Sequence, residues 1–426
     1  MNKKLLYSLL ISGAIRYFIS ISKYSRSIEN HVEISTPLNS FKRLKEGVFL
    51  YDNGIDPYDG DIFHESPFIL IAANFLLKNF GEFISLILII IDLLSAVFIY
   101  YGSKSISKRN YERQQLEVST YAKGTEEIQF SKSDIDNIPF ICAFAYLFNP
   151  YSILNCVGQT TTVWSNFLLS VVIYSMSKNM KFICLLALAF ETQKNFYPFV
   201  LIVPIALAFS ENDKSKNLKR IITVVTFASI FGLLNYIAFT YMGNWKFLDS
   251  TFGFIIHCRD LTPNIGLFWY FFTEMFDHFR ELFLYTFQLN TTILYLFPLT
   301  FTFKESPEFL LTILLSLVTI FSSYPCIGAI AFYMSLIPLW KRCSPFMSHN
   351  FIVIATFIVT SILGPTVYHL WMYANSANAN FYFGVTLVFC TSQIFLLTDL
   401  CFAYLKRKFC LTNGVTFDKT MKLSLE

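Results

Sequence analysis

Charged residues are scarce in this sequence. Only 15% of its 426 residues are Asp, Glu, Lys or Arg, whereas soluble domains average about 25%. Hydrophobic residues make up 54% of the chain, and its formal net charge is only +4. This composition excludes a disordered protein and one that binds nucleic acid. It indicates instead a helical protein that crosses a membrane several times.

The nine cysteines lack the spacing of metal and disulfide sites. No two form a Cys-x-x-Cys pair, and none stands at ligand spacing from a histidine. Most lie within apolar segments, where cysteine behaves as a small hydrophobic residue. We therefore expect no zinc site, no other metal or cofactor, and no disulfide framework.

A recognisable catalytic set is also missing. No combination of Ser, His and Asp, or of Cys and His, stands out from the scatter of these residues. His257 and Cys258 are neighbours, but adjacent side chains on regular structure point apart, so they cannot act as base and nucleophile. We expect no catalytic residue in this chain.

Long apolar runs dominate what the sequence does contain. A helix needs ~20 apolar residues to cross a bilayer, and about twelve segments approach this length, although the pair around 191–195 also fits one bent hairpin. We expect an all-α fold, with residues 1–426 forming a single transmembrane helical domain. The expected spans are 5–21, 83–101, 139–157, 163–177, 182–190, 196–209, 221–241, 289–303, 309–321, 327–339, 351–370 and 381–403.

The first apolar segment has two interpretations. Lys3, Lys4, a short apolar run and Ser12-Gly13-Ala14 resemble a signal peptide with its cleavage site. The apolar run continues to Ile19, however, which favours a retained membrane anchor.

Basic residues indicate which loops share a side of the membrane, because Lys and Arg of short loops stay in the cytoplasm. Placing both termini in the cytoplasm puts the basic clusters there as well. The luminal loops are then about 22–67, 242–266 and 371–380. The cytoplasmic clusters are Lys104, Lys108, Arg109 and Arg113; Lys178 and Lys181; Lys214, Lys216, Lys219 and Arg220; Lys341 and Arg342; and Lys406, Arg407 and Lys408.

Residues 267–287 are predicted not to cross. Their acidic and histidine side chains recur at the spacing of one helix face, so we expect an amphipathic helix that lies in the interface or turns its polar face over a cavity. Thr262-Pro263-Asn264 is suited to start it. Mutual pairing, Glu274 with His278 and Asp277 with Arg280, explains the same pattern without any function. The residues on this face are Glu274, Asp277, His278 and Glu281.

An acidic loop precedes the second span. Carboxylates beside a histidine are suited to hold a divalent metal or to act as a base on a sugar acceptor, with Asp56 or Asp59 as the base. The loop lacks the spacing of a defined calcium site, and its Asn-Gly, Asp-Pro and Asp-Gly pairs equally indicate turns. The residues are Asp52, Asp56, Asp59, Asp61, His64 and Glu65.

Uncharged amides gather at another membrane boundary, in the run after the eleventh span. Asparagine donors and acceptors suit the hydroxyls of a glycan or phosphate oxygens, although a simple hairpin turn explains them as well. Together with the polar groups around the amphipathic segment they form our predicted lipid- or glycan-binding set. Its members are Asn375, Asn378, Asn380, His369, Asp260, Asn264, Glu274 and His278.

Several runs resemble a known family. They are TPLNSFKRLKEG, DPYDG followed by FHESP, LFNPYSIL, SYP, DLTPNIGLFWYFF, HLWMYANSANANFY and LTNG. From about residue 16 to 414 the chain is similar to the PIG-U subunit of the GPI transamidase complex. Departures are local: Ala329 and Ala331 follow SYP, and Asn375 stands where Gly is frequent in that family.

The resemblance implies a non-catalytic, multi-pass subunit of the endoplasmic reticulum membrane. It would help to bind the GPI glycolipid for attachment to the C-terminus of precursor proteins. Its partners would be the other transamidase subunits, including a caspase-like protease that carries the nucleophile, and its fold would resemble the multi-span mannosyltransferases. The alternative is an ER mannosyltransferase in GPI biosynthesis that uses a dolichol-linked sugar, with Asp56 or Asp59 as base; stable association with a protease would distinguish the two.

The topology can be tested with engineered glycosylation acceptors. An acceptor placed within residues 22–67 should be modified in cells and one within 102–138 should not, because only this orientation keeps the basic clusters in the cytoplasm. Modification of the second loop but not the first would invert the topology.

Overall fold

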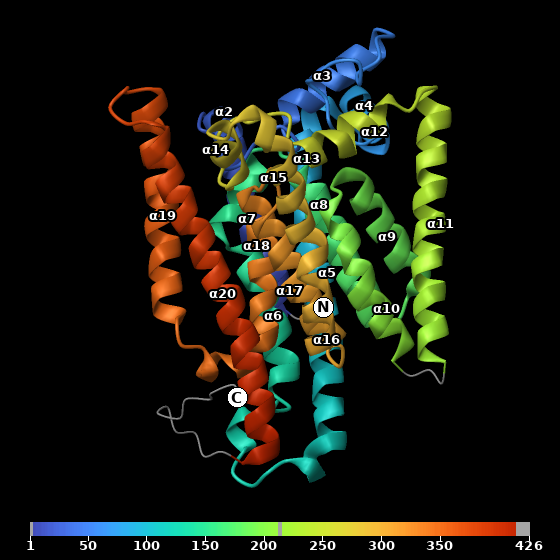
Figure 1. Ribbon diagram of the computed structural model, residues 1–426, viewed down its shortest axis with the longest axis vertical. Helices are drawn as coiled ribbons and strands as arrows, with labels where there is room; N and C mark the ends of the chain where they lie inside the picture. Colours follow the sequence, from blue (N-terminus) through green and yellow to red (C-terminus); the bar gives the residue numbers. More distant parts are fainter. Residues whose placement is uncertain (1–2, 212–214, 415–426) are drawn as a thin grey trace.

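The computed structural model describes residues 3–211 and 215–414, which form an all-helical bundle (Figure 1). No strand occurs within these two ranges. The expected all-α class is therefore confirmed. Lys214, which belongs to one expected cytoplasmic cluster, lies outside the described residues.

The helices follow one another with few long connections. In the first half they are α1 Lys3–Ser20, α2 Ser25–Glu29, α3 Phe41–Asp52, α4 Pro67–Phe80, α5 Ile84–Glu117, α6 Asp134–Leu147, α7 Pro150–Val157, α8 Thr162–Ser177, α9 Lys181–Lys194, α10 Ile202–Ser210 and α11 Lys216–Met242. In the second half they are α12 Lys246–Leu248, α13 Phe254–His257, α14 Phe268–Thr273, α15 Asp277–Leu289, α16 Leu296–Phe303, α17 Pro307–Ile320, α18 Ile327–Leu336, α19 Asn350–Met372 and α20 Ala379–Asn413. Short 3-10 segments are η1 Gly81–Phe83, η2 Val118–Thr120, η3 Glu126–Ile128, η4 Tyr197–Leu201 and η7 Ile337–Phe346, and π segments are η5 Asp249–Gly253 and η6 Asn290–Leu294.

Five helical segments of the described chain are long and apolar enough to cross a membrane. A sixth is the pair α6 and α7, which together pass the same test but are bent by 48°. The described chain is thus helical, with several candidate membrane spans. Each of the twelve expected spans lies on helical residues, but many of these helices are short, so the number of crossings stays a prediction. The five segments are Pro67–Thr120, Lys216–Met242, Asp277–Phe303, Asn350–Met372 and Ala379–Asn413.

The break between α6 and α7 follows from the sequence Asn149-Pro150. Proline has no backbone N–H and interrupts a continuous helix, but it fits the first turn of a new one. The Asn149 side chain accepts a hydrogen bond from the backbone N–H of Tyr151 at 3.0 Å and so caps α7. Tyr151 in the first turn of α7 contacts both later helices, through a hydrogen bond with Ser361 of α19 and a ring contact with Phe389 of α20.

Helix α1 is joined to the bundle by a buried ion pair. The Arg16 guanidinium donates to Asp92 of α5 at 2.7 Å and to the backbone oxygen of Leu147 at 2.9 Å. The Tyr146 hydroxyl donates to the other Asp92 oxygen at 2.6 Å. Both charged side chains are fully buried. This packing is what a retained anchor requires; whether the segment is retained stays a prediction.

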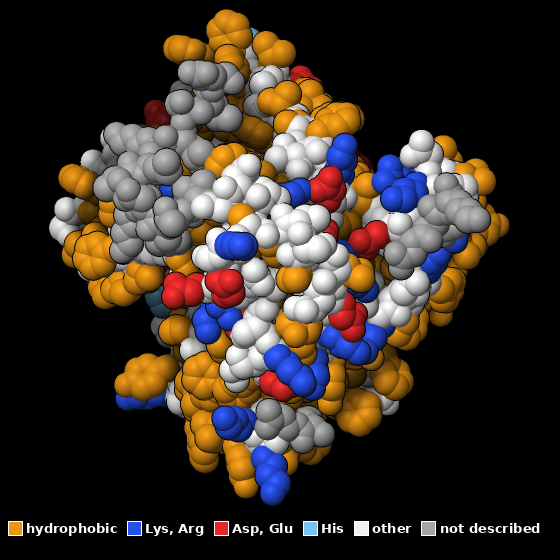
Figure 2. All heavy atoms as spheres, turned by 90° about the horizontal axis from the view of Figure 1, so that it is seen from below, with side chains coloured by type: hydrophobic (Ala, Val, Ile, Leu, Met, Phe, Trp, Pro, Cys, Tyr) orange, Lys and Arg blue, Asp and Glu red, His pale blue; other side chains and the backbone are white. Residues whose placement is uncertain are grey.

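The two ends of the bundle differ in character. The three loops expected to share one side, about 22–67, 242–266 and 371–380, lie at the same, upper end in Figure 1. Figure 2 shows Lys and Arg side chains, interspersed with Asp and Glu, across the middle of the opposite end and hydrophobic side chains at its margin. Glu308 is held at that end by Arg109 at 2.8 Å and Arg113 at 3.2 Å. The compartment that each end faces stays a prediction.

The single amphipathic helix expected over 267–287 is wrong. Helix α14 ends at Thr273, residues 274–276 are not helical, and α15 continues through η6 and α16 as one segment, Asp277–Phe303, that is long enough to cross. The turn folds α14 back, so that the ring of Phe272 packs against Phe287 with centroids 5.4 Å apart. The burial of these aromatic rings therefore offsets the cost of interrupting the helix between α14 and α15. Glu274 no longer shares a helix with His278, whereas the Asp277–Arg280 pair forms at 2.7 Å.

Loss of the buried pair should destabilise the protein strongly. Asp92→Ala should cost about 3 to 5 kcal/mol, because it leaves the Arg16 guanidinium buried without its counter-charge. The control Asp136→Ala removes a carboxylate that is 77% exposed and 3.6 Å from Lys104, and it should have little effect because exposed pairs contribute little. Thermal unfolding in detergent measures both, and equal losses would contradict the assignment.

Candidate functional site

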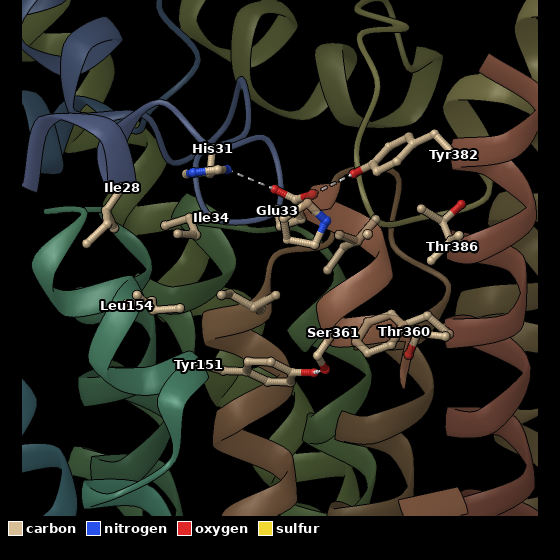
Figure 3. Close-up of a pocket in the computed structure, with 16 residues that line it drawn as sticks. Ile28, His31, Glu33, Ile34, Tyr151, Leu154, Thr360, Ser361, Tyr382 and Thr386 are labelled. Carbon is tan, nitrogen blue, oxygen red and sulfur yellow. Dashed lines mark hydrogen bonds and ion pairs between the residues drawn. The ribbon is translucent and has the colours of Figure 1, made fainter. Parts of the chain in front are cut away.

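An apolar cavity lies between α7 on one side and α19 and α20 on the other (Figure 3). Its volume is about 790 Å³, part of which is open to the surroundings. We call it the slot. Helix α2 contributes Ile28, the loop between α2 and α3 contributes Ile34, and α7 contributes Leu154. Ile265 and Ile327 approach from the second half of the chain. The walls are therefore built from segments far apart in the sequence.

Small residues on α19 leave room for the slot. Thr360, Ser361 and Gly364 face it, and Pro365 follows them within the helix. A Cβ atom added to Gly364 would meet only one heavy atom within 4 Å, the Glu33 Oε1 at 3.9 Å. The space beside Gly364 is therefore a property of the backbone packing, and a larger side chain there would fill it.

One end of the slot carries polar groups. His31 Nδ1 lies 3.6 Å from Glu33 Oε2, and the Tyr382 hydroxyl donates to Glu33 Oε1 at 3.2 Å (Figure 3). Because the Glu33 carboxylate accepts from the protonated imidazole, it raises the pKa of His31 above its ordinary value, and partial burial opposes this shift. Farther along the slot, the hydroxyls of Tyr151 and Ser361 hydrogen-bond each other. The slot thus combines apolar walls with a polar end.

Helix α14 covers this polar end with aromatic rings. The Trp269 ring lies 5.9 Å from that of Tyr382 and 6.1 Å from that of Trp371. Tyr270 stacks on Phe383 at 4.3 Å. The run 260–272, which the sequence singled out, therefore lies over the slot and reaches into it at Ile265.

The asparagine run meets α14 directly. The Tyr270 hydroxyl donates a hydrogen bond to the side chain of Asn380. Asn378 caps α20 by accepting from the backbone N–H groups of Asn380 and Phe381 at 3.1 and 3.2 Å, and Asn375 has a left-handed φ of 51°. All three side chains are exposed. The structure thus joins the two predicted patches, and it uses two of the asparagines for a cap and a turn.

The remaining members of the predicted set do not line the slot. Asp260 pairs with Arg43 at 2.9 Å, and the buried Asn264 accepts from the backbone N–H of Gly266 at 2.8 Å. Both shape the turn that delivers Ile265 to the slot. His369 is exposed and stacks on Tyr373 at 5.2 Å. The exposed Glu274 and His278 do not line the slot.

The acidic loop is spread over separate contacts. Asp52 pairs with Lys78 at 2.6 Å, Asp56 accepts from Asn244 at 2.7 Å, and Asp59 pairs with Lys246. In residues 3–211 and 215–414 no three His, Cys, Asp or Glu side chains are grouped closely enough to hold a metal ion. Asp56 and Asp59 do not line the slot, and their partners do not favour either as a free general base. Of the remaining side chains, Asp61 is exposed, whereas His64 and Glu65 are buried.

Sequence reasoning missed the groups at the polar end of the slot. His31 and Glu33 belong to the expected loop 22–67, in which only the acidic residues between 52 and 65 were predicted to have a function. Tyr382 is the last residue of the run HLWMYANSANANFY, which the sequence singles out. Its partner Glu33, however, lies 349 residues away in sequence. Only the fold brings these groups together.

The polar end should make stability depend on pH. Because folding raises the pKa of His31, its stabilising contact is fully present below the ordinary value of about 6.5 and is lost as the pH rises through the raised value. The difference in melting temperature between wild type and His31→Gln should therefore shrink between pH 5.5 and 8. The effect should be small, since His31 is 41% exposed. In a Glu33→Gln background the difference should be absent; its persistence there would contradict the pairing.

Comparisons with known proteins agree with the sequence runs. The family model described as GPI transamidase subunit PIG-U matches residues 10–389. The human GPI-anchor transamidase component PIGU is 36% identical over 97% of this chain and 97% of its own length. The Chinese hamster protein of the same name is 36% identical over 96% and 95%, and the GPI transamidase component GAB1 of Saccharomyces cerevisiae is 26% identical over 92% and 91%. The chain therefore belongs to the PIG-U family of GPI transamidase subunits.

Proposed function

We propose that this subunit binds the GPI glycolipid in the slot and presents it to the rest of the transamidase. The observation that supports this most directly is the chemistry of the slot, whose apolar walls end in a cluster of polar side chains. In this proposal the chain is not catalytic, and a caspase-like protease subunit supplies the nucleophile. The names of the relatives, GPI-anchor transamidase component and GPI transamidase component, agree with a role within a complex.

The slot suits an amphiphile because each part of such a ligand finds its own surroundings. Acyl chains that enter from the bilayer exchange lipid contacts for van der Waals contacts with the apolar walls of α7, α19 and α20, so they stay out of water throughout. Head-group hydroxyls meet His31, Glu33 and Tyr382 at the polar end, where hydrogen bonds offset the cost of removing them from water. The glycan then extends past α14 toward the exposed Asn375, Asn378 and Asn380, with His369 beside them. Asp260 and Asn264 act indirectly, by holding Ile265 in place.

The membrane setting follows from the same proposal. We place the chain in the endoplasmic reticulum membrane, with both termini in the cytoplasm and twelve crossing segments in an arrangement like that of the multi-span mannosyltransferases. The polar end of the slot and the asparagine run then face the lumen. The basic end shown in Figure 2 faces the cytoplasm, as the positive-inside rule requires.

Filling the slot should remove the lipid. Gly364→Leu places an apolar side chain in the open space beside Glu33, so GPI recovered with the purified transamidase should fall several-fold, and GPI attachment in cells should fall with it. The matched control is Gly232→Leu on α11, where an added Cβ meets no atom within 4 Å. Mass spectrometry of the co-purified glycolipid measures the effect. Equal recovery from both variants would refute docking in the slot.

The asparagine run should contribute through several weak contacts. A lost neutral hydrogen bond costs roughly 0.5 to 1.5 kcal/mol, so a single Asn→Ala change should weaken GPI binding only several-fold. The triple change Asn375→Ala, Asn378→Ala and Asn380→Ala should weaken it much more. Unchanged lipid recovery and unchanged GPI attachment would show that the run is only a turn and a helix cap.

A further inference from the structure

A second cavity lies beside the slot and is lined by many polar side chains. Its volume is about 650 Å³, and it lies where residues 36–39, 194–198 and 322–326 meet above α8, α9 and α17. We call it the chamber. The segment from Ile34 to Thr36 lies between the chamber and the slot, because Ile34 lines the slot and Thr36 lines the chamber. This segment is held in place by the backbone N–H of Ile327, which donates to the backbone oxygen of Glu33 at 3.1 Å. The chamber is thus a distinct site.

Glu191 of α9 lines the chamber with an unpartnered carboxylate. The residue is 0% exposed, and neither carboxylate oxygen has a hydrogen-bond partner among the described residues. Removing an ionised carboxylate from water without a compensating partner costs several kcal/mol, on the order of the penalty for any buried ion. Such a group is rarely kept in a fold unless something satisfies it.

The neighbouring lysine attracts Glu191 through space but makes its direct contact with another carboxylate. Lys194 Nζ lies 3.3 Å from Glu65 Oε1, and the same Glu65 oxygen accepts from the Thr161 hydroxyl. Around the chamber the described chain therefore sets two carboxylates, Glu65 and Glu191, against one ammonium. One negative charge is left over when both carboxylates are ionised.

Asn166 adds a further acceptor without a donor. Its Nδ2 donates to the Tyr146 hydroxyl and to the Gly328 backbone oxygen, each at 3.2 Å. These two bonds fix the orientation of the amide, and its Oδ1 then finds no donor within the described chain. The unpartnered polar atoms that line the chamber, the Asn166 Oδ1 and both Glu191 oxygens, are all acceptors.

We propose that the chamber binds a protonated primary amine. An ammonium group carries three N–H donors and one positive charge, which matches the unpartnered acceptors and the surplus negative charge. The hydroxyls of Thr162, Ser165 and Ser322 line the same space and suit a hydroxyl or ester oxygen beside the amine. A quaternary ammonium fits the charge but supplies no donor. The amine comes from a lipid head group or from a soluble molecule, and both sources share this chemistry.

The first experiment uses the intact transamidase complex in mild detergent. 2-Aminoethanol should raise its melting temperature in a concentration-dependent way, whereas ethylene glycol, of the same size but with a hydroxyl in place of the amine, should not. Glu191→Gln should raise the midpoint concentration for 2-aminoethanol about tenfold or more, because a hydrogen bond to a charged group is lost. The control Glu112→Gln makes the same change at an exposed position on α5 and should behave as wild type.

The second experiment distinguishes the sources of the amine. The complex is reconstituted into phosphatidylcholine nanodiscs with or without phosphatidylethanolamine, and native mass spectrometry records the lipid that it retains. Selective retention of phosphatidylethanolamine by wild type but not by Glu191→Gln supports a lipid head group. A response to 2-aminoethanol without such retention supports a soluble amine.

Two outcomes would overturn the proposal. One is a wild-type complex that responds to neither amine source, which would mean that the chamber holds water. The other is a Glu191→Gln complex that responds as wild type does. If that variant fails to assemble, the wild-type comparison of 2-aminoethanol with ethylene glycol still decides, and Ala329→Leu, which adds volume at the chamber wall, should abolish the response.

Discussion

Inside a bilayer no water replaces a missing hydrogen bond, and this constraint governs how the bundle is built. Arg16 is buried only because Asp92 neutralises it and because backbone oxygens accept its other N–H groups. Asp92 in turn accepts from Tyr146, and Tyr146 accepts from Asn166. This chain of contacts links α1, α5, α6 and α8 into one body. The slot and the chamber are the places where the same rule leaves room for a ligand.

The slot depends on features that interrupt regular helices. The Asn149-Pro150 cap starts α7 at an angle to α6. On α19, Gly364 and Pro365 present little side-chain volume to the slot. The turn at 274–276 then folds α14 back over the polar end, where Trp269 packs on Tyr382. Helix breaks of this kind cost stability unless packing offsets them. Here they lie at the walls and at the polar end of the slot.

The sequence predicted the helical class and the position of each apolar segment, because a run of apolar residues must become a helix in hydrocarbon. It did not predict the turn at 274–276, since the burial of Phe272 against Phe287 is a tertiary contact that helix periodicity does not contain. It also missed Glu33, whose partner Tyr382 is 349 residues away. For Asn375 and Asn378 the turn interpretation matches their observed conformations. Whether they also bind a glycan depends on a ligand that no sequence pattern specifies.

The central claim, that the slot holds the acyl chains of GPI, is tested most directly by photo-crosslinking. A diazirine-bearing amino acid would replace Val385, which lines the slot, or Val224, which is 43% exposed on the outer face of α11. Both variants would be assembled into the transamidase in membranes that contain labelled GPI, and the labelled subunit would be quantified after illumination. Capture several-fold greater at Val385 than at Val224 is the result we predict. Equal capture at the two positions would mean that GPI meets this subunit only as bulk lipid and would contradict the slot as its binding site.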